Sequence, residues 1–252
     1  MATPTTFLAI ALGLLAIDAA IELGFVTSMV AFLHSGAPSG VYEVRSSSST
    51  STYNISGVPL RLLVNQGHTS NGAAGTALVL ICIVGVIALT GRRLLLSPSS
   101  RKGGVSATLA AVLYYVWVAL QIPALLLTVG ALGYVFTVTH RHSGQTIDQN
   151  VAAQIHDAAT QKYPLDSWTP QSWFSAVTEQ LTFVDPGLRA NLIRHLRIMR
   201  GWQYNLIPLF LLQLAETIAA ILDFRHWRNG SYNHSYNRKQ SGSYDGPQTS
   251  QV

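Results

Sequence analysis

The chain has 252 residues, of which 48% are apolar and 11% are charged, whereas about 25% of the residues in an average soluble domain are charged. This composition excludes an ordinary soluble protein, and the single cysteine, Cys82, excludes an intrachain disulfide framework. The net charge of +5 comes from basic residues beside apolar segments, so a lipid bilayer is a better match than nucleic acid as a partner.

Four apolar segments are long enough to cross a bilayer, which takes about 20 helical residues. They cover residues 7–33, 73–96, 107–138 and 204–224. The first could also be a signal peptide, but Asp18 and Glu22 interrupt it and no basic residue precedes it, which favours a retained span. The third is longer than a bilayer requires and must tilt, bend near Pro123 or protrude. We therefore predict an all-α fold in which residues 1–224 form a bundle of four transmembrane helices.

The distribution of Lys and Arg predicts the orientation, because short loops rich in these residues stay in the cytoplasm. The connection between the second and third spans and the segment after the fourth each contain four basic residues: Arg92, Arg93, Arg101 and Lys102, then Arg225, Arg228, Arg238 and Lys239. The first loop, about residues 34–72, contains only Arg45 and Arg61. We predict cytoplasmic termini, with outer loops at about 34–72 and 139–203, in the secretory pathway or the plasma membrane.

The two outer loops differ in character. The first contains a Ser/Thr-rich stretch, RSSSSTSTYNIS, which lacks the apolar residues to fold alone. It includes the glycosylation acceptor Asn54-Ile55-Ser56, whereas the acceptor triplets at Asn229 and Asn233 lie in the polar tail, residues 225–252, and should stay unmodified. We predict that this tail is disordered.

The loop between the third and fourth spans is predicted to form a small helical extracytoplasmic subdomain. A capping box over residues 146–149 opens a helix with apolar residues through Ala159, and Thr169-Pro170 opens a second. Asp185-Pro186 opens a third, which leads directly into the fourth span. The arginines on its other faces either lie on lipid headgroups or pack on the other loop helices. They are Arg189, Arg194, Arg197 and Arg200.

Polar residues also occur deep inside the spans, where a charged group costs about 2.5–3.5 kcal/mol. Asn205, Gln213, Glu216 and Asp223 form one stripe on the fourth span, and Tyr114, Gln121 and Thr128 recur every seven residues on the third. From the rise per residue we predict an intramembrane polar layer near the bilayer midplane. Its members are Asp18, Glu22, Gln121, Gln213 and Glu216. No Lys, Arg or His occurs at that depth, so we expect at least one of the carboxyl groups to be neutral.

Two interpretations of this layer stay open. It is either a cluster of interhelical hydrogen bonds that fixes the packing, or a site that carries protons, binds a cation or acts as an acid and base on a lipid-soluble substrate. His34, His140 and His142 form only a weak metal-binding pattern, and no nucleotide, hydrolase or metalloprotease motif occurs. We therefore predict no metal, no cofactor and no catalytic residue.

The segments YPLDSWTPQSWF and MRGWQYNLIPLFLL resemble stretches of uncharacterised four-span integral membrane proteins of filamentous fungi. The layout of a short first and a larger second outer loop also resembles that of tetraspanins, but this chain lacks the cysteines that tetraspanin and claudin-like loops contain. The resemblance implies a membrane location and a four-span architecture. It does not indicate an activity. The expected function is a non-catalytic organiser or accessory subunit that binds other membrane proteins or itself. The alternatives are a proton-coupled carrier or channel component and a membrane-embedded enzyme that uses the intramembrane carboxylates.

Overall fold

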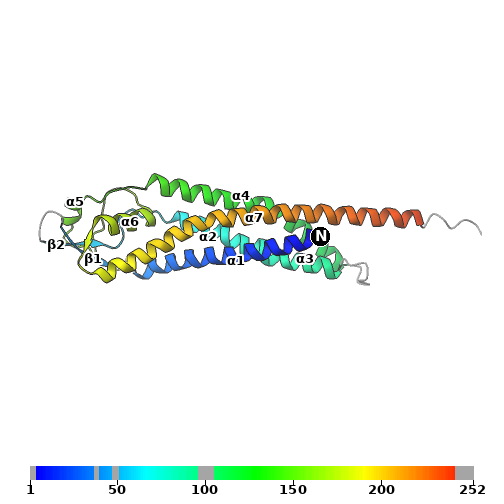
Figure 1. Cartoon of the computed structure of the whole chain (residues 1–252), viewed down its shortest axis with the longest axis horizontal. Helices are drawn as coiled ribbons and strands as arrows, with labels where there is room; N and C mark the ends of the chain where they lie inside the picture. The colour runs from blue at the N-terminus through cyan, green and yellow to red at the C-terminus, as the bar shows by residue number, and fades with distance from the viewer. Residues whose placement is uncertain (1–3, 37–39, 47–50, 96–104, 242–252) are drawn as a thin grey trace, which may run out of the picture.

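The computed structural model describes residues 4–36, 40–46, 51–95 and 105–241, with side chains up to residue 229. Most of this part of the chain is helical, and it contains four helices that are long and apolar enough to cross a membrane (Figure 1). They cover Pro4–Gly36, Asn65–Leu94, Val105–Arg141 and Pro186–Asn229. The four predicted spans are confirmed as helices of this length and composition, and each helix extends beyond the predicted span at one or both ends.

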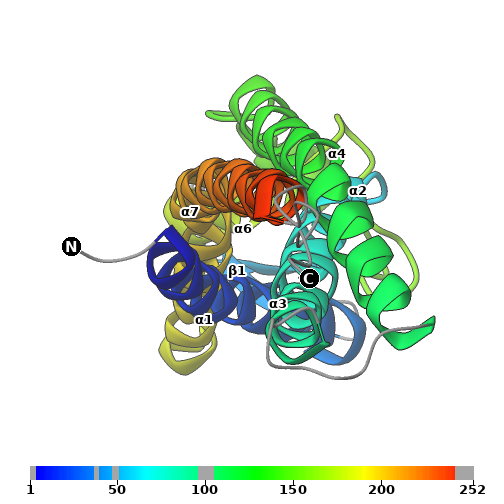
Figure 2. The same cartoon turned by 90° about the vertical axis from the view of Figure 1, so that its right-hand side faces the viewer.

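Seven α-helices and two short π-helical segments make up the helical part of the described chain. The long helices are α1 (Pro4–Ala31) continued by η1 (Phe32–Gly36), α2 (Asn65–Gly75) continued by η2 (Thr76–Ile83) and α3 (Val84–Leu95), then α4 (Val105–Arg141) and α7 (Pro186–Ser241). Helix α7 packs against both α1 and α4, and α3 packs against α4, which gives one elongated bundle (Figures 1 and 2). Helix α4 continues through Pro123.

The helices are apolar on the faces that point out of the bundle as well as on those that point in. In α1, Leu8, Leu12 and Leu15 are buried, whereas Ile10 and Ile17 are exposed. A helix that is apolar all round is typical of a membrane span. The bundle core is closely packed, because the Trp117 ring lies over Gly85 and its Nε1 donates a hydrogen bond of 3.0 Å to the Ile81 carbonyl oxygen.

One end of the bundle holds a small subdomain built from both long loops (Figure 1). It contains β1 (Val41–Arg45), β2 (Thr52–Ser56), α5 (Gln149–Ala153), α6 (Pro170–Gln180) and β3 (Thr182–Phe183). The antiparallel sheet has the order β2-β1-β3, with Tyr42 opposite Ile55 and Val44 opposite Phe183. Alternation in β1 buries Tyr42 and Val44 on one face.

The four long helices are consistent with the predicted all-α bundle, and the sheet is a correction to the purely helical subdomain. The first loop folds because the loop between the third and fourth spans, the third loop of the chain, covers it. Trp173 Nε1 of α6 donates to the Gly57 carbonyl oxygen at 2.9 Å, and Trp168 forms a bridge with Leu62. Trp168, Trp173 and Tyr163 are fully buried at the centre of this joint core. Neither loop alone supplies enough apolar surface for such a core.

The predicted helix starts in the third loop agree with the structure in part. Thr169 caps α6 through a reciprocal bond with Ser172, and Asp185 Oδ1 accepts from the Gly187 N–H at the start of α7, as predicted. The first predicted helix of this loop, α5, is shorter than predicted, because Asp148 caps it and it ends at Ala153. The chain leaves the helix before Asp157, whose carboxylate accepts from the Ala159 N–H in a local turn of its own.

Helix α7 is one continuous helix that contains both the third predicted helix of this loop, which begins at Pro186, and the predicted fourth span. It continues to Ser241. Residues 225–241, which we predict to belong to a disordered tail, are therefore helical in the structure. Trp227 extends the packed region past the predicted end at residue 224, because its ring meets those of Tyr114 and Tyr115 at centroid distances of 5.4 and 5.7 Å. The rest of the predicted tail, residues 242–252, lies outside the described part of the chain.

Candidate functional site

The polar stripes of α4 and α7 face one another inside the bundle. Three side chains of α4, spaced seven residues apart, each donate a hydrogen bond to a side chain of α7. The bonds are Tyr114 Oη to Asp223 Oδ2 at 2.7 Å, Gln121 Nε2 to Glu216 Oε1 at 3.2 Å and Thr128 Oγ1 to Gln213 Oε1 at 2.5 Å. Seven residues are close to two helical turns, so the α4 residues share one face, and the partners run in the opposite order along α7. We call this set of three bonds the polar ladder.

The rung nearest the N-terminus of α1 ties all four long helices together. The Asp223 carboxylate accepts from Tyr114 of α4, from Thr5 of α1 at 2.7 Å and from both terminal nitrogens of Arg92 of α3. The Arg92 guanidinium also lies 4.4 Å from the centroid of the Tyr114 ring. Asp223 therefore has a cationic partner from this chain, although the charge of Arg92 predicts only a place in a basic loop.

A signal for the position of Arg92 exists in the sequence. Ala88, Leu89 and Arg92 follow the spacing of one helix face, and the first two are buried. The same spacing places Arg92 on the core side of α3, where its side chain is 8% exposed.

The α1 carboxylates belong to the interface between α1 and α7. Glu22 is fully buried and its Oε2 accepts from Asn205 Nδ2 at 3.1 Å. Asp18 is also buried but has no hydrogen bond to a member of the predicted polar layer among the described residues. Within the predicted layer, the structure joins Gln121 to Glu216. Glu22 and Gln213 are bonded to Asn205 and Thr128, which lie outside the predicted layer.

Several buried polar atoms in the bundle have no hydrogen-bond partner among the described residues. They are Asp18 Oδ2, Glu22 Oε1, Gln121 Oε1, Gln213 Nε2, Glu216 Oε2 and Thr217 Oγ1. An unsatisfied buried polar atom costs about 1–3 kcal/mol, so these positions suit bound water, and the carboxyl oxygens among them also suit an added proton. Within the same part of the chain, no group of three or more His, Cys, Asp or Glu side chains is arranged to hold a metal ion.

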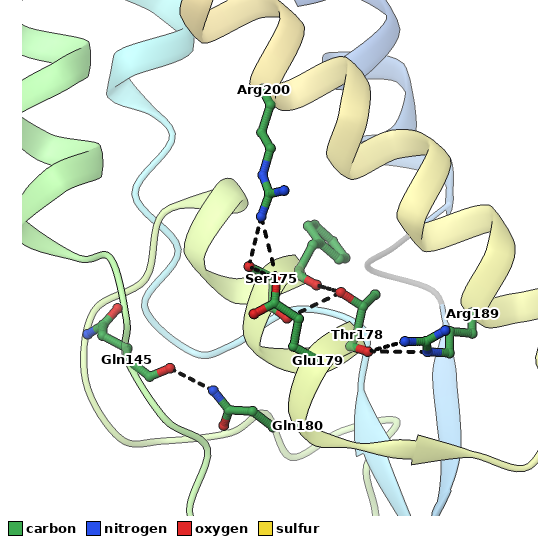
Figure 3. Close-up of polar contacts among 8 residues, drawn as sticks. Gln145, Ser175, Thr178, Glu179, Gln180, Arg189 and Arg200 are labelled. Carbon is green, nitrogen blue, oxygen red and sulfur yellow. Dashed lines mark hydrogen bonds and ion pairs between the residues drawn. The ribbon is translucent and has the colours of Figure 1, made fainter.

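A second polar cluster lies in the subdomain, between α6 and the first turns of α7 (Figure 3). Arg200 Nη2 donates to Ser175 Oγ at 3.1 Å and lies 3.5 Å from Glu179 Oε1, which also accepts from Ser175 at 2.8 Å. Arg189 donates twice to the Thr178 carbonyl oxygen, at 3.2 and 3.1 Å. Arg189 and Arg200, two of the four arginines of the third predicted loop helix, thus pack on α6. The Arg200–Glu179 pair is more than half exposed and contributes little to stability.

The predicted glycosylation site lies on the surface of the subdomain. Asn54 is exposed in the middle of β2, an edge strand of the sheet, and pairs in register with Glu43 of β1. Asn229 lies on α7 at the opposite end of the bundle.

Comparison with protein-family models, characterised proteins and solved structures finds no match to this chain. The similarity to four-span proteins of filamentous fungi stays a prediction.

Proposed function

We propose that the protein crosses a membrane four times, with both termini in the cytoplasm and the subdomain on the extracytoplasmic side. The apolar outer faces of the bundle favour lipid as its surroundings. At the end opposite the subdomain, the described residues include four arginines: Arg92, Arg93, Arg225 and Arg228. Their position favours a cytoplasmic location for that end. Arg101 and Lys102, which belong to the same argument, lie outside the described residues.

We infer that this membrane protein is a non-catalytic organiser or accessory subunit that binds other membrane proteins or a second copy of itself. The polar ladder is the observation that carries this proposal. Its α4 donors are all engaged by α7 acceptors, so these groups hold the bundle together. An interhelical hydrogen bond of this kind contributes about 0.6–2 kcal/mol in a membrane. The outer helix faces and the subdomain surface are left for partners.

The unpartnered carboxyl oxygens favour a second candidate, a proton-coupled carrier or channel component. Asp18, Glu22 and Glu216 each have one buried oxygen without a hydrogen bond among the described residues. Intramembrane carboxyl groups in this state are typical of proton relays. An enzyme that used the same carboxylates would need the same free oxygens.

Amide and leucine variants of the polar layer separate the two candidates. If the layer is structural, Asp18→Asn and Glu216→Gln should keep the melting temperature in detergent, because an amide replaces a neutral carboxyl group with little change in hydrogen bonding. Glu216→Leu should lower it, because Gln121 then loses its acceptor. The charge control is Glu179→Gln, which changes an exposed carboxylate of the subdomain.

The transport readout is proton flux into liposomes loaded with a pH-sensitive dye. The organiser proposal expects no flux above that of empty liposomes, for the unmodified protein and for both amide variants. A pH-driven flux that the folded amide variants lose, and that Glu179→Gln keeps, would establish the carrier instead.

A further inference from the structure

A cavity of about 560 Å³ lies at the junction of the bundle and the subdomain. The end of α1, the segment after β2, the start of α2 and helix α7 surround it, and its walls are mostly apolar. Val26, Val30, Leu62 and Met199 are among the residues that line it. This volume is within the range of about 300–1,000 Å³ that is usual for small-molecule sites.

One buried donor in the cavity wall has no partner. Trp202 lines the cavity and is 3% exposed, and its indole Nε1 makes no hydrogen bond to any described residue. The other buried indoles, those of Trp117, Trp168 and Trp173, all donate to backbone carbonyl oxygens. A buried indole N–H usually finds an acceptor. The Trp202 nitrogen is covered by protein atoms, so a ligand oxygen reaches this free donor only when the neighbouring side chains shift.

The charge and the exposure of the rim indicate the kind of ligand. Lys162, His34 and His68 line the mouth and are exposed, and none of the lining residues is Asp or Glu. Leu60 and Val64 lie on the same rim and are 60% and 40% exposed. An apolar interior whose lining includes one lysine and no acidic residue complements an amphipathic molecule that carries a negative group at its head.

We propose that this cavity binds one acyl chain of a membrane phospholipid. In this arrangement Trp202 Nε1 donates to an ester carbonyl oxygen, and the Lys162 ammonium group contacts the phosphate. The proposal rests on the membrane placement proposed above, which puts the junction at the level of the lipid headgroups. Tryptophan favours this depth, because its ring is apolar and its N–H needs an acceptor. A lipid of the surrounding leaflet can then enter past the exposed Leu60 and Val64.

Two glycines of α2 provide a matched pair of variants. Gly67 lines the cavity, and a Cβ added there would have no atom within 4 Å. Gly72 lies on the same helix and has equally open space, but it does not line the cavity. Leucine at either position favours the helix over glycine, so both variants should fold. Only Gly67→Leu fills the cavity.

The test uses the full chain in vesicles of phosphatidylcholine that contain a trace of phosphatidylcholine with a photoreactive group on one acyl chain. After illumination, labelled peptides are quantified by mass spectrometry. We expect labelling at the cavity walls, at least a tenfold loss in Gly67→Leu and no change in Gly72→Leu. Trp202→Phe keeps the ring but removes the donor, and Lys162→Gln removes the cation, so each should lower labelling several-fold. Arg194→Gln, an exposed cation outside the cavity, should not.

Equal labelling of the unmodified protein and Gly67→Leu would overturn the proposal, as would an equal loss in both glycine variants. A photoreactive fatty acid that labels the cavity as strongly as the phospholipid, with no effect of Lys162→Gln, would overturn the choice of a phospholipid. If Gly67→Leu lacks a cooperative melting transition, the labelling of Trp202→Phe and Lys162→Gln tests the proposal instead, and labelling equal to that of the unmodified protein in both would overturn it. Failure of the membrane placement is separately visible, because the protein would not float with the vesicles, and the labelling is then repeated with the probe in detergent micelles.

Discussion

Arg92 and Asp223 form an ion pair in the interior of the bundle, with side chains that are only 8% and 2% exposed. Thr5 and Tyr114 donate to the same carboxylate, so Asp223 has partners on every neighbouring long helix. A buried pair of this kind adds little stability over apolar residues of similar volume, but a charge left without its partner is costly. The pair therefore fixes which helix faces meet.

This arrangement predicts a difference between single and double variants. Arg92→Met leaves a buried carboxylate without its cation and should lower the free energy of unfolding by about 3–5 kcal/mol. The double variant Arg92→Met/Asp223→Leu should lose clearly less, because no charge then stays buried. Unfolding in detergent, followed by tryptophan fluorescence, measures both, and the exposed neighbour Arg93→Met is the control. Equal losses in the single and double variants would show that packing, and not charge pairing, dominates here.

The contact between Gly85 and Trp117 predicts a second effect on stability. A Cβ at residue 85 would lie 2.8 Å from Trp117 ring atoms, so Gly85→Ala must displace a ring that is buried and hydrogen-bonded. We expect a loss of about 1–3 kcal/mol from overpacking, despite the higher helix propensity of alanine. Gly130→Ala on α4, where a Cβ has open space, should be neutral or stabilising. Thermal unfolding of the two variants in the same detergent makes the comparison.

The four long helices could be predicted because each apolar run is longer than a bilayer core requires, and the seven-residue spacing of Tyr114, Gln121 and Thr128 placed them on one face. The pairs across helices could not be predicted. A stripe shows which face of α7 is polar, but the choice of Asn205 as the partner of Glu22 depends on the relative height of α1 and α7. Arg92 was missed because its charge suggested a loop.

The sheet could not be predicted for a different reason. β1 alternates clearly, but its five residues are too few to distinguish a strand from a polar loop, and β3 has only two residues. The β1–β3 pairing joins Val44 to Phe183, residues separated by most of the chain. Such a contact becomes stable only when α6 and the buried tryptophans close the core over it.

Burial of Tyr42 predicts a loss of subdomain stability in alkali. Tyr42 is 2% exposed, and this burial raises the pKa of its phenol above the ordinary tyrosine value. The unfolded chain therefore loses this proton first as the pH rises above about 10, so the contribution of Tyr42 is complete below that pH and declines above it. The melting temperature, followed by near-ultraviolet circular dichroism at a series of pH values between about 8 and 11, measures this loss of stability.

Tyr42→Phe should make this melting temperature less dependent on alkaline pH, because the titrating group is gone. Tyr204→Phe is the control, since Tyr204 is 58% exposed. An unchanged alkaline dependence in Tyr42→Phe would mean that other groups of the subdomain govern it.

The glycosylation acceptors at the two ends of the molecule give the most direct test of the proposed orientation. Asn54 is exposed on β2 in the subdomain, whereas Asn229 lies near the other end, on α7. Only extracytoplasmic acceptors receive a glycan, so in a eukaryotic host the unmodified protein should lose mass on glycosidase treatment. Asn54→Gln should abolish this shift, and Asn229→Gln should leave it unchanged. A shift that survives Asn54→Gln and disappears in Asn229→Gln or Asn233→Gln would invert the topology, and the subdomain with its cavity would then face the cytoplasm.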